Sequence, residues 1–159
     1  MIEYRKQLER GVINNAYKGL MEYIMALRTH LKNKYPDFII SGSIYFGYMD
    51  MTYFSFSPVS MKQQGLKVAI VFNHDAFQFE AWLSGKNKQI QSKFWKYFKE
   101  SDWKKYHIVP TTKGVDSIVE HPLVENPDFS DVDSLTRQIE GEGLKFIWDV
   151  EHFLTKNPI

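Results

Sequence analysis

Residues 66–85, with the sequence LKVAIVFNHDAFQFEAWLSG, decide the fold that we predict. Residues 66–72 are almost continuously apolar, which is typical of a strand in the middle of a sheet. Residues 73–75 are polar turn formers. From residue 77 to residue 84 apolar and polar side chains alternate, which indicates a strand with one buried face. The stretch therefore predicts two antiparallel strands joined by a short turn.

The residues before this stretch predict two further strands. Residues 38–58 are rich in Ile, Tyr, Phe and Thr and are interrupted by two glycines and an aspartate. We interpret residues 39–48 and 51–57 as antiparallel strands with a turn near Met49 and Asp50. A loop is expected over residues 58–65. Further along, residues 103–109 and 115–121 are candidates for a small hairpin.

Helical periodicity marks the two ends and the centre of the chain. We predict helices over residues 2–10, 12–35, 87–101 and 131–155. Ser130 is the predicted N-cap of the last helix, which Gly141 and Gly143 would weaken or break. The predicted fold is α+β, an antiparallel meander of four to six strands packed against N-terminal, central and C-terminal helices. Residues 1–159 are expected to form a single globular domain.

The composition limits the classes of function. The chain has 159 residues, 16% of them aromatic, and no cysteine. The absence of cysteine excludes disulfides and thiolate chemistry and fits a cytoplasmic protein. No apolar segment follows the first residues, so we expect no signal peptide, and no apolar run reaches the length of a membrane span.

Charge is unevenly distributed along the chain. Residues 86–107 hold seven lysines and two acids, a sum of 7 − 2 = +5. Residues 116–151 hold ten acids and two basic residues, a sum of 2 − 10 = −8. Mutual attraction of the two segments, or solvation of each, is the simpler explanation. A basic surface for a phosphate-bearing partner is the alternative.

Two stretches carry a resemblance to a known family. GYMDMTYFSFSP (47–58) and LKVAIVFNHDAFQFEAWLSGKNKQIQSKFW (66–95) resemble a bacterial family of small single-domain proteins of unknown function, and AYKGLMEYIMALRTHL (16–31) is similar to it as well. The resemblance implies a bacterial cytoplasmic protein. It supplies no catalytic residue and no activity.

The surplus of aromatic residues predicts an aromatic-lined pocket. Rings bind apolar or planar molecules well, and ligand pockets are mostly apolar. Our first hypothesis is a non-enzymatic ligand- or protein-binding, regulatory domain that takes a small apolar ligand or a peptide. The predicted lining residues are Tyr45, Tyr48, Tyr53, Trp82 and Trp95.

The second hypothesis is an enzyme of unknown class that uses His74, Asp75 and Glu80. Acid–base catalysis needs two titratable groups in one cleft, and these three flank one strand-turn-strand. A simpler role for Asp75 is to accept hydrogen bonds from the backbone of its own turn.

The segment after the fourth strand suggests two kinds of partner. Gly85, Lys86 and Lys88 precede a helix, and helix N-termini bind anions, although the residues do not form a P-loop. Lysines and rings recur from Lys86 to Lys105, as in single-strand nucleic-acid sites. An ordinary amphipathic helix explains that pattern better, so nucleic acid is kept only as a third hypothesis.

We expect no metal and no cofactor. The five histidines include no HExxH or His-x-His pair. His107 and His121 are the one pair that a hairpin over residues 103–121 would place opposite each other. The oligomeric state is open, and exposed rings would favour a homodimer.

Overall fold

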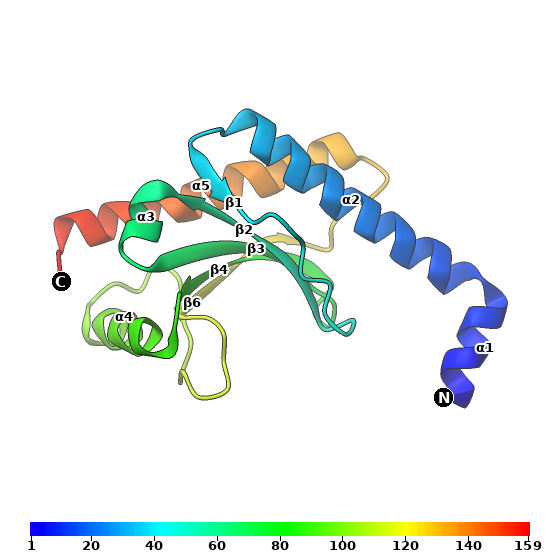
Figure 1. Cartoon of the computed structure of the whole chain (residues 1–159), viewed down its shortest axis with the longest axis horizontal. Helices are drawn as coiled ribbons and strands as arrows, with labels where there is room; N and C mark the ends of the chain where they lie inside the picture. The colour runs from blue at the N-terminus through cyan, green and yellow to red at the C-terminus, as the bar shows by residue number, and fades with distance from the viewer.

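A six-stranded antiparallel sheet forms the centre of the protein in a computed structural model that describes residues 1–159 (Figure 1). The strands lie in the order β1-β2-β3-β4-β6-β5. The α+β class and the antiparallel sheet are therefore confirmed. The elements are α1 (Ile2–Arg10), α2 (Val12–Lys34), β1 (Phe38–Ile40), β2 (Met51–Pro58), α3 (Val59–Gln63), β3 (Leu66–Asn73), β4 (Gln78–Gly85), α4 (Lys88–Glu100), β5 (His107–Ile108), β6 (Val119–Glu125) and α5 (Val132–Lys156).

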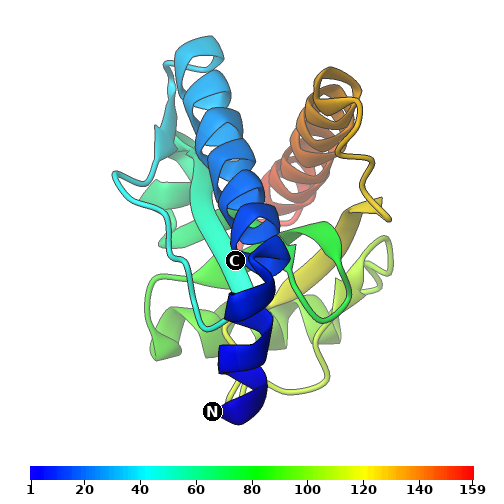
Figure 2. The same cartoon turned by 90° about the vertical axis from the view of Figure 1, so that its right-hand side faces the viewer.

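Helices α2 and α5 lie side by side over one face of the sheet, as Figures 1 and 2 both show. Alternate side chains of each strand face these helices and are buried, because successive residues of a strand point to opposite faces. Phe54 of β2, Ile70 of β3 and Ala81 of β4 belong to this core together with Leu27 of α2 and Ile147 of α5. No helix has the length and apolar character that crossing a membrane requires.

Helix α4 follows directly after β4 and lies at that end of the sheet, below it in Figure 1. Its N-cap is Asn87, whose side chain accepts a hydrogen bond from the backbone N–H of Ile90 at 2.9 Å. Phe98 of α4 stacks on Phe153 of α5, with ring centroids 5.5 Å apart. Because α4 is anchored at this end, it leaves the middle of the sheet's second face uncovered by a helix.

The predicted strand over residues 39–48 is wrong. Only β1 forms there, and a single backbone bridge between Tyr45 and Tyr53 continues the pairing. The guanidinium of Arg28 donates to the carbonyl oxygens of Ser41 and Gly42, at 2.6 and 2.8 Å from Nη2. These bonds hold the two carbonyls toward α2, so the chain leaves the sheet at this point.

The turn that leads into β2 has its own polar support. The Oδ1 atom of Asp50 accepts the backbone N–H groups of Tyr48 and Met51, each at 2.8 Å. Gly47 has a φ of 70°, and a Cβ there would lie 2.2 Å from the carbonyl oxygen of Met51. Only glycine fits this position, because a side chain would both strain the backbone and clash with it.

The remaining boundaries differ from the prediction in local ways. Helix α5 is continuous through both glycines, and its N-cap is Asp131 rather than Ser130. A Cβ on Gly143 would lie 3.5 Å from Cδ1 of Ile70, so this glycine sits where α5 approaches β3. The predicted loop over residues 58–65 contains α3, and the predicted hairpin strands shrink or shift to β5 and β6.

Two buried carboxylates of the acidic C-terminal segment are paired with basic residues. Glu140 contacts Lys34 Nζ at 2.6 Å and His30 Nε2 at 3.0 Å. Asp149 contacts Lys105 Nζ at 2.7 Å, which joins the lysine-rich segment to the acidic one. The opposite charges along the chain therefore partly neutralise each other within the fold.

Candidate functional site

The candidate site lies on the sheet face that α2 and α5 do not cover. Ala69 of β3 is the small residue in its middle, opposite Ser55 on β2 and opposite Trp82 on β4. The larger side chains of Tyr53 and Trp82 stand on either side of it. A hollow results, because a methyl group lies between two aromatic rings.

Two tyrosines from different parts of the chain form one wall. Tyr45, in the loop after β1, and Tyr53, in β2, exchange both backbone N–H···O bonds at 2.9 Å. Their ring centroids lie 5.0 Å apart with an angle of 32° between the planes. Burial raises the pKa of Tyr53, and the neighbouring charge of Asp116 and then Tyr45 raise it further. Tyr53 is thus a neutral phenol at physiological pH.

A hydrogen-bonded indole forms the opposite wall. Trp82 Nε1 donates to Glu80 Oε2 at 2.6 Å. The other oxygen of Glu80 accepts from Asn73 Nδ2 at 3.1 Å and from Gln78 Nε2 at 2.6 Å. Glu80 is only 6% exposed, so its carboxylate is held by three neutral donors and in turn fixes the indole plane.

The cavity between these walls has a volume of about 270 Å³. It is lined by Tyr45, Met51, Tyr53, Lys67, Ala69, Trp82, Ser84, Gly85 and Asp116. Its rings come from the loop after β1, from β2 and from β4, and its polar side chains are those of Lys67, Ser84 and Asp116. Such a cavity is suited to a planar group that ends in polar substituents.

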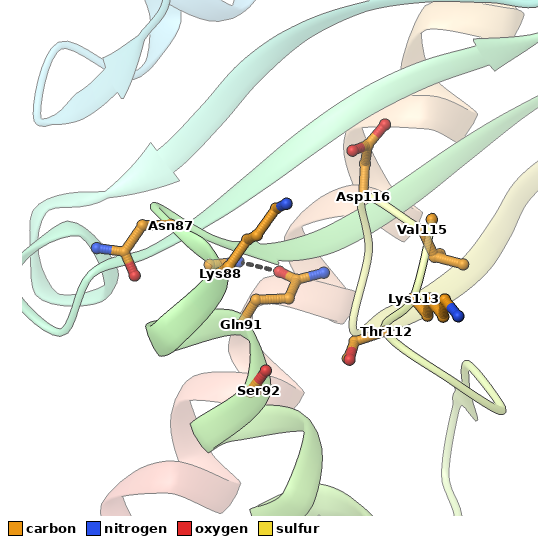
Figure 3. A pocket seen from close by; sticks show the side chains of 10 residues that line it. Asn87, Lys88, Gln91, Ser92, Thr112, Lys113, Val115 and Asp116 are labelled. Atoms are coloured by element: carbon orange, nitrogen blue, oxygen red, sulfur yellow. Dashed lines mark hydrogen bonds between the residues drawn. The ribbon is translucent and has the colours of Figure 1, made fainter.

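A second, polar cavity of about 610 Å³ adjoins the first, and both are lined by Gly85 and Asp116. It lies between the first turns of α4 and the loop over residues 112–116 (Figure 3). Its other lining residues are Asn87, Lys88, Gln91, Ser92, Thr112, Lys113, Gly114 and Val115. We call the two cavities together the sheet-face site.

Gln91 closes the inner end of the polar cavity. Its Oε1 atom accepts the backbone N–H of Gly85 at 2.6 Å, which fixes the orientation of the amide. Its Nε2 atom is the one buried side-chain nitrogen or oxygen without a hydrogen-bond partner. A Cβ on Gly85 would lie 2.5 Å from the backbone nitrogen of Gln91, so a glycine is required at this junction.

The structure brings together three of the five predicted ring residues, namely Tyr45, Tyr53 and Trp82. Tyr48 lies outside the site and is 91% exposed. Trp95 packs against the core instead, and its Nε1 donates to the carbonyl oxygen of Val109 at 2.8 Å. Both residues are predicted from residue type alone. Tyr48 lies in the turn before β2 and Trp95 on α4, and neither lines the cavity.

Of the predicted anion-binding residues, Gly85 and Lys88 line the polar cavity and Lys86 does not. The backbone N–H of Lys86 donates to Gly65 at 2.8 Å, and its side chain runs alongside that glycine. No sequence pattern predicts Gln91 or Asp116 as site residues, because the cavity forms only where α4 meets a loop distant in sequence.

His74, Asp75 and Glu80 are not brought together. His74 lies on the face covered by α2, where its Nε2 is 2.9 Å from Thr52 Oγ1. Burial lowers the pKa of His74, against the opposing effects of Asp50 and Asp75. Asp75 is exposed in the turn, and Glu80 faces the opposite side of the sheet. The alternation of side chains along strands separates the three, so the predicted acid–base site is not formed.

The two histidines considered for a metal are also separated. In the pairing of β5 with β6, His107 lies opposite Glu120, not opposite His121. His121 points to the other face, with its ring centroid 4.5 Å from that of Tyr106. Burial lowers the pKa of His121. No group of three or more histidine and acidic side chains is arranged to hold a metal ion.

The rings of the lysine-rich segment pack inward. Phe94 and Phe98 are buried, and Trp103 stacks on Phe153 with centroids 5.0 Å apart. Lys105 is paired with Asp149. The lysines of this segment therefore do not alternate with exposed rings along one groove.

An apolar groove of about 500 Å³ lies on the α2 side of the molecule. It runs between the first half of α2, the turn after β3 and the start of α5, and rings provide much of its lining. Its residues are Ile13, Asn15, Ala16, Tyr17, Gly19, Leu20, Tyr23, Met49, His74, Phe77, Phe129 and Val132. Several of them are exposed large apolar side chains, among them Met49, Phe77 and Val132.

The protein is thus an α+β protein in which an aromatic hollow and a polar cavity adjoin each other on one face of the sheet. The profile of the family described as a domain of unknown function, DUF7000, matches residues 1–154, and the chain belongs to this family. No curated protein and no solved structure matches the chain.

Proposed function

We propose that the protein is a non-enzymatic domain that binds a small, ring-bearing molecule in the sheet-face site. One observation carries the proposal: Tyr45, Tyr53 and Trp82, from three separate segments, line the same 270 Å³ cavity. Aromatic side chains that share one cavity bind planar groups by stacking and by edge-to-face contact. The cavity has room for one ring, and it shares the lining residues Gly85 and Asp116 with the larger cavity.

The role of Glu80 supports binding rather than catalysis. Its carboxylate oxygens accept hydrogen bonds from Asn73, Gln78 and Trp82, so they are engaged with the protein. A carboxylate held by three neutral donors is a positioning group for the indole. The cavity wall is thereby fixed before a ligand arrives, which lowers the cost of binding.

Ligand-observed NMR with planar probes tests the proposal. Indole and adenosine are titrated against the wild-type protein and against Trp82→Ala. Because stacking on one aromatic side chain contributes roughly 1–3 kcal/mol, removal of Trp82 is expected to weaken binding about tenfold.

Trp148→Ala is the matched control. Trp148 is 60% exposed and stacks on His152 of α5, away from the sheet-face site. This variant is expected to bind the probes as the wild type does. Equal losses in the two variants, or no binding of either probe to the wild type, would refute the proposal.

The apolar groove supports a second candidate function, self-association as a homodimer. It presents Met49, Phe77 and Val132 to solvent, with side chains about half exposed. A two-fold dimer that places this patch against its own copy would bury both sets of side chains. The patch lies on the opposite side of the sheet from the sheet-face site, so both functions are compatible.

Sedimentation velocity over a range of protein concentrations tests this second function. We expect the wild type to form a dimer and Phe77→Ser to shift it toward the monomer. Trp148→Ala removes an exposed ring outside the groove and should leave the distribution unchanged. A wild type that stays monomeric at the highest concentration contradicts the idea.

We also propose that the protein works in the cytoplasm. The absence of cysteine supports this location, since a reducing compartment offers no disulfides for stabilisation. Fractionation of cells that express the full natural chain, with antibody detection, tests it.

A further inference from the structure

The polar half of the sheet-face site contains hydrogen-bond donors that nothing in the protein uses. Gln91 is only 7% exposed, and its Nε2 has no partner. Because Oε1 is occupied by the N–H of Gly85, the amide cannot turn to satisfy itself. Figure 3 shows the nitrogen directed away from the helix axis, toward the loop over residues 112–116, across the cavity. A buried donor without an acceptor is costly, so its position indicates an acceptor supplied from outside.

The start of α4 adds a further donor to the polar cavity. The side-chain oxygen of Asn87 accepts the backbone N–H of Ile90, and its carbonyl oxygen accepts the backbone N–H of Gln91. The N–H groups of Lys88 and Gln89, the first two residues of the helix, have no acceptor within it. Of these two residues, Lys88 lines the polar cavity. The helix dipole places partial positive charge at the same end.

Side-chain charge acts in the same direction. Lys88 on α4 and Lys113 on the facing loop line the cavity together with one acid, Asp116, a sum of 2 − 1 = +1. Asp116 lies where the two cavities meet and lines both. It is therefore placed between the aromatic hollow and the donors of α4.

We propose that the polar cavity binds an oxyanion, a phosphate or a carboxylate, carried by the ring-bearing ligand. The oxyanion accepts from Gln91 Nε2 and from the free backbone N–H of Lys88, and the Lys88 ammonium is its counter-ion. The ring occupies the hollow between Tyr53 and Trp82, and a hydroxyl or amino group between ring and anion donates to Asp116. The description of the ligand rests on the proposed function, whereas the anion site depends only on its own residues.

Nitrogen-edited NMR titration of the full chain tests the anion site directly. The probes are inorganic phosphate and acetate, each at constant ionic strength so that general screening does not change. We expect saturable shifts of the backbone amide of Lys88 and of the side-chain NH₂ of Gln91. A response to phosphate alone assigns a phosphate ligand, and a response to acetate alone assigns a carboxylate ligand. A response to neither overturns the inference.

Two lysines of the same helix form a matched pair of variants. Lys88→Ala removes the charge that lines the cavity, and a charge-assisted contact of this kind is expected to change affinity about tenfold. Lys93→Ala removes an equal charge beside the ring of Phe94, outside the lining, and should leave affinity unchanged. Equal weakening by both variants would mean a diffuse attraction to the basic helix and would overturn the site.

Gln91→Glu tests the unpaired amide. The new carboxylate still accepts the N–H of Gly85 but presents an oxygen where the free NH₂ group stood. Saturable binding of the anion is expected to disappear while the spectrum of the rest of the fold is retained. Should Gln91→Glu fail to fold, the Lys88 and Lys93 pair still decides the matter.

A comparison of probes separates this inference from the proposed function. Adenosine and indole carry a ring without an anion, and adenosine 5′-monophosphate and indole-3-acetate carry both. We expect the anionic member of one pair to bind at least about tenfold more tightly, with a gain that Lys88→Ala removes. Binding of the neutral rings without that gain overturns the inference alone. Anion shifts without any binding of a ring overturn the proposed function alone.

Discussion

The indole Nε1 of Trp82 and the Oε2 of Glu80 lie 2.6 Å apart, two residues from each other along the same face of β4. This contact explains how a sheet face without a covering helix keeps a large aromatic side chain in one orientation. The carboxylate is buried and collects two more donors from neighbouring side chains. A residue that resembles a catalytic acid in the sequence therefore supports a ring in the structure.

We expect Glu80→Ala to destabilise the protein by about 2–3 kcal/mol. The substitution leaves the donors of Asn73, Gln78 and Trp82 without their acceptor in a largely buried place, and each unsatisfied donor is costly. Urea unfolding at neutral pH measures the loss. Binding of indole should fall as well, because the Trp82 ring is no longer held in place.

Glu125→Ala is the control for that experiment. Glu125 lies opposite Gln78 in the pairing of β4 with β6 and is exposed. Its removal should change the free energy of unfolding by less than about 0.5 kcal/mol. If Glu80→Ala were as mild as this control, the hydrogen-bonded carboxylate would have no structural role.

Glu140 predicts an acid-sensitive component of stability. Burial alone would raise the pKa of Glu140, but hydrogen bonds from Lys34, Tyr35 and His30 outweigh it and lower the pKa from 4.5 to about 2. A pKa that folding lowers gives stability that is present above the ordinary value and is lost as the pH falls toward 2. Wild-type stability should therefore decline between about pH 4.5 and pH 2, in part through this group.

Glu140→Gln isolates that component. The variant is expected to be about 1–3 kcal/mol less stable than the wild type at pH 7, because charge-assisted bonds to Lys34 and His30 are lost. The difference should shrink as the pH approaches 2. Thermal or urea unfolding at several pH values measures it, with Glu9→Gln on the exposed helix α1 as the control. A difference that stays constant with pH contradicts the lowered pKa.

Gly141→Ala should stabilise the protein by roughly 0.5–1 kcal/mol. Gly141 lies within the continuous helix α5, and a Cβ there would meet no other atom within 4 Å. Alanine is favoured over glycine in a helix because it loses less backbone entropy on folding. A rise in the unfolding midpoint at unchanged slope in urea would show the effect, and a fall would mean that the helix bends at this point.

Gly47→Ala should have the opposite sign. Gly47 adopts a φ of 70°, and a Cβ there would lie 2.2 Å from the carbonyl oxygen of Met51. The turn before β2 must shift to accept it, so we expect a loss of about 1–3 kcal/mol. The shift should also reach Tyr45 and weaken indole binding, since the same loop carries that ring. Unfolding and binding of this variant, measured in parallel, check both statements.

Local patterns were sufficient for most of the fold. The alternation over residues 77–84 and the apolar run over residues 66–72 correspond to β4 and β3, and the helices lie close to their predicted ranges. The error over residues 39–48 has a long-range cause, because Arg28 on α2 binds the carbonyl groups of that segment. Side-chain contacts of this kind leave no periodic signal in the sequence.

Some residues of the candidate site could likewise be predicted from local patterns, and others could not. Tyr53 and Trp82 were predictable, since both are rings on strands whose other face is buried. Gln91 was not, because its importance depends on the N–H of Gly85 and on the position of a loop more than twenty residues away. The separation of His74 from Glu80 follows from strand parity and could have been read from the register, had the pairing been known.

The two outermost strands of the sheet are very short. β1 has three residues and β5 has two, so neither outermost strand itself offers a long row of free backbone N–H and carbonyl groups. Such rows are the templates on which sheets of separate molecules join into fibres. The part of β6 that extends beyond β5 contains Pro122, which has no N–H group to donate to an added strand. Short outermost strands and this proline both work against amyloid-like stacking of the chain.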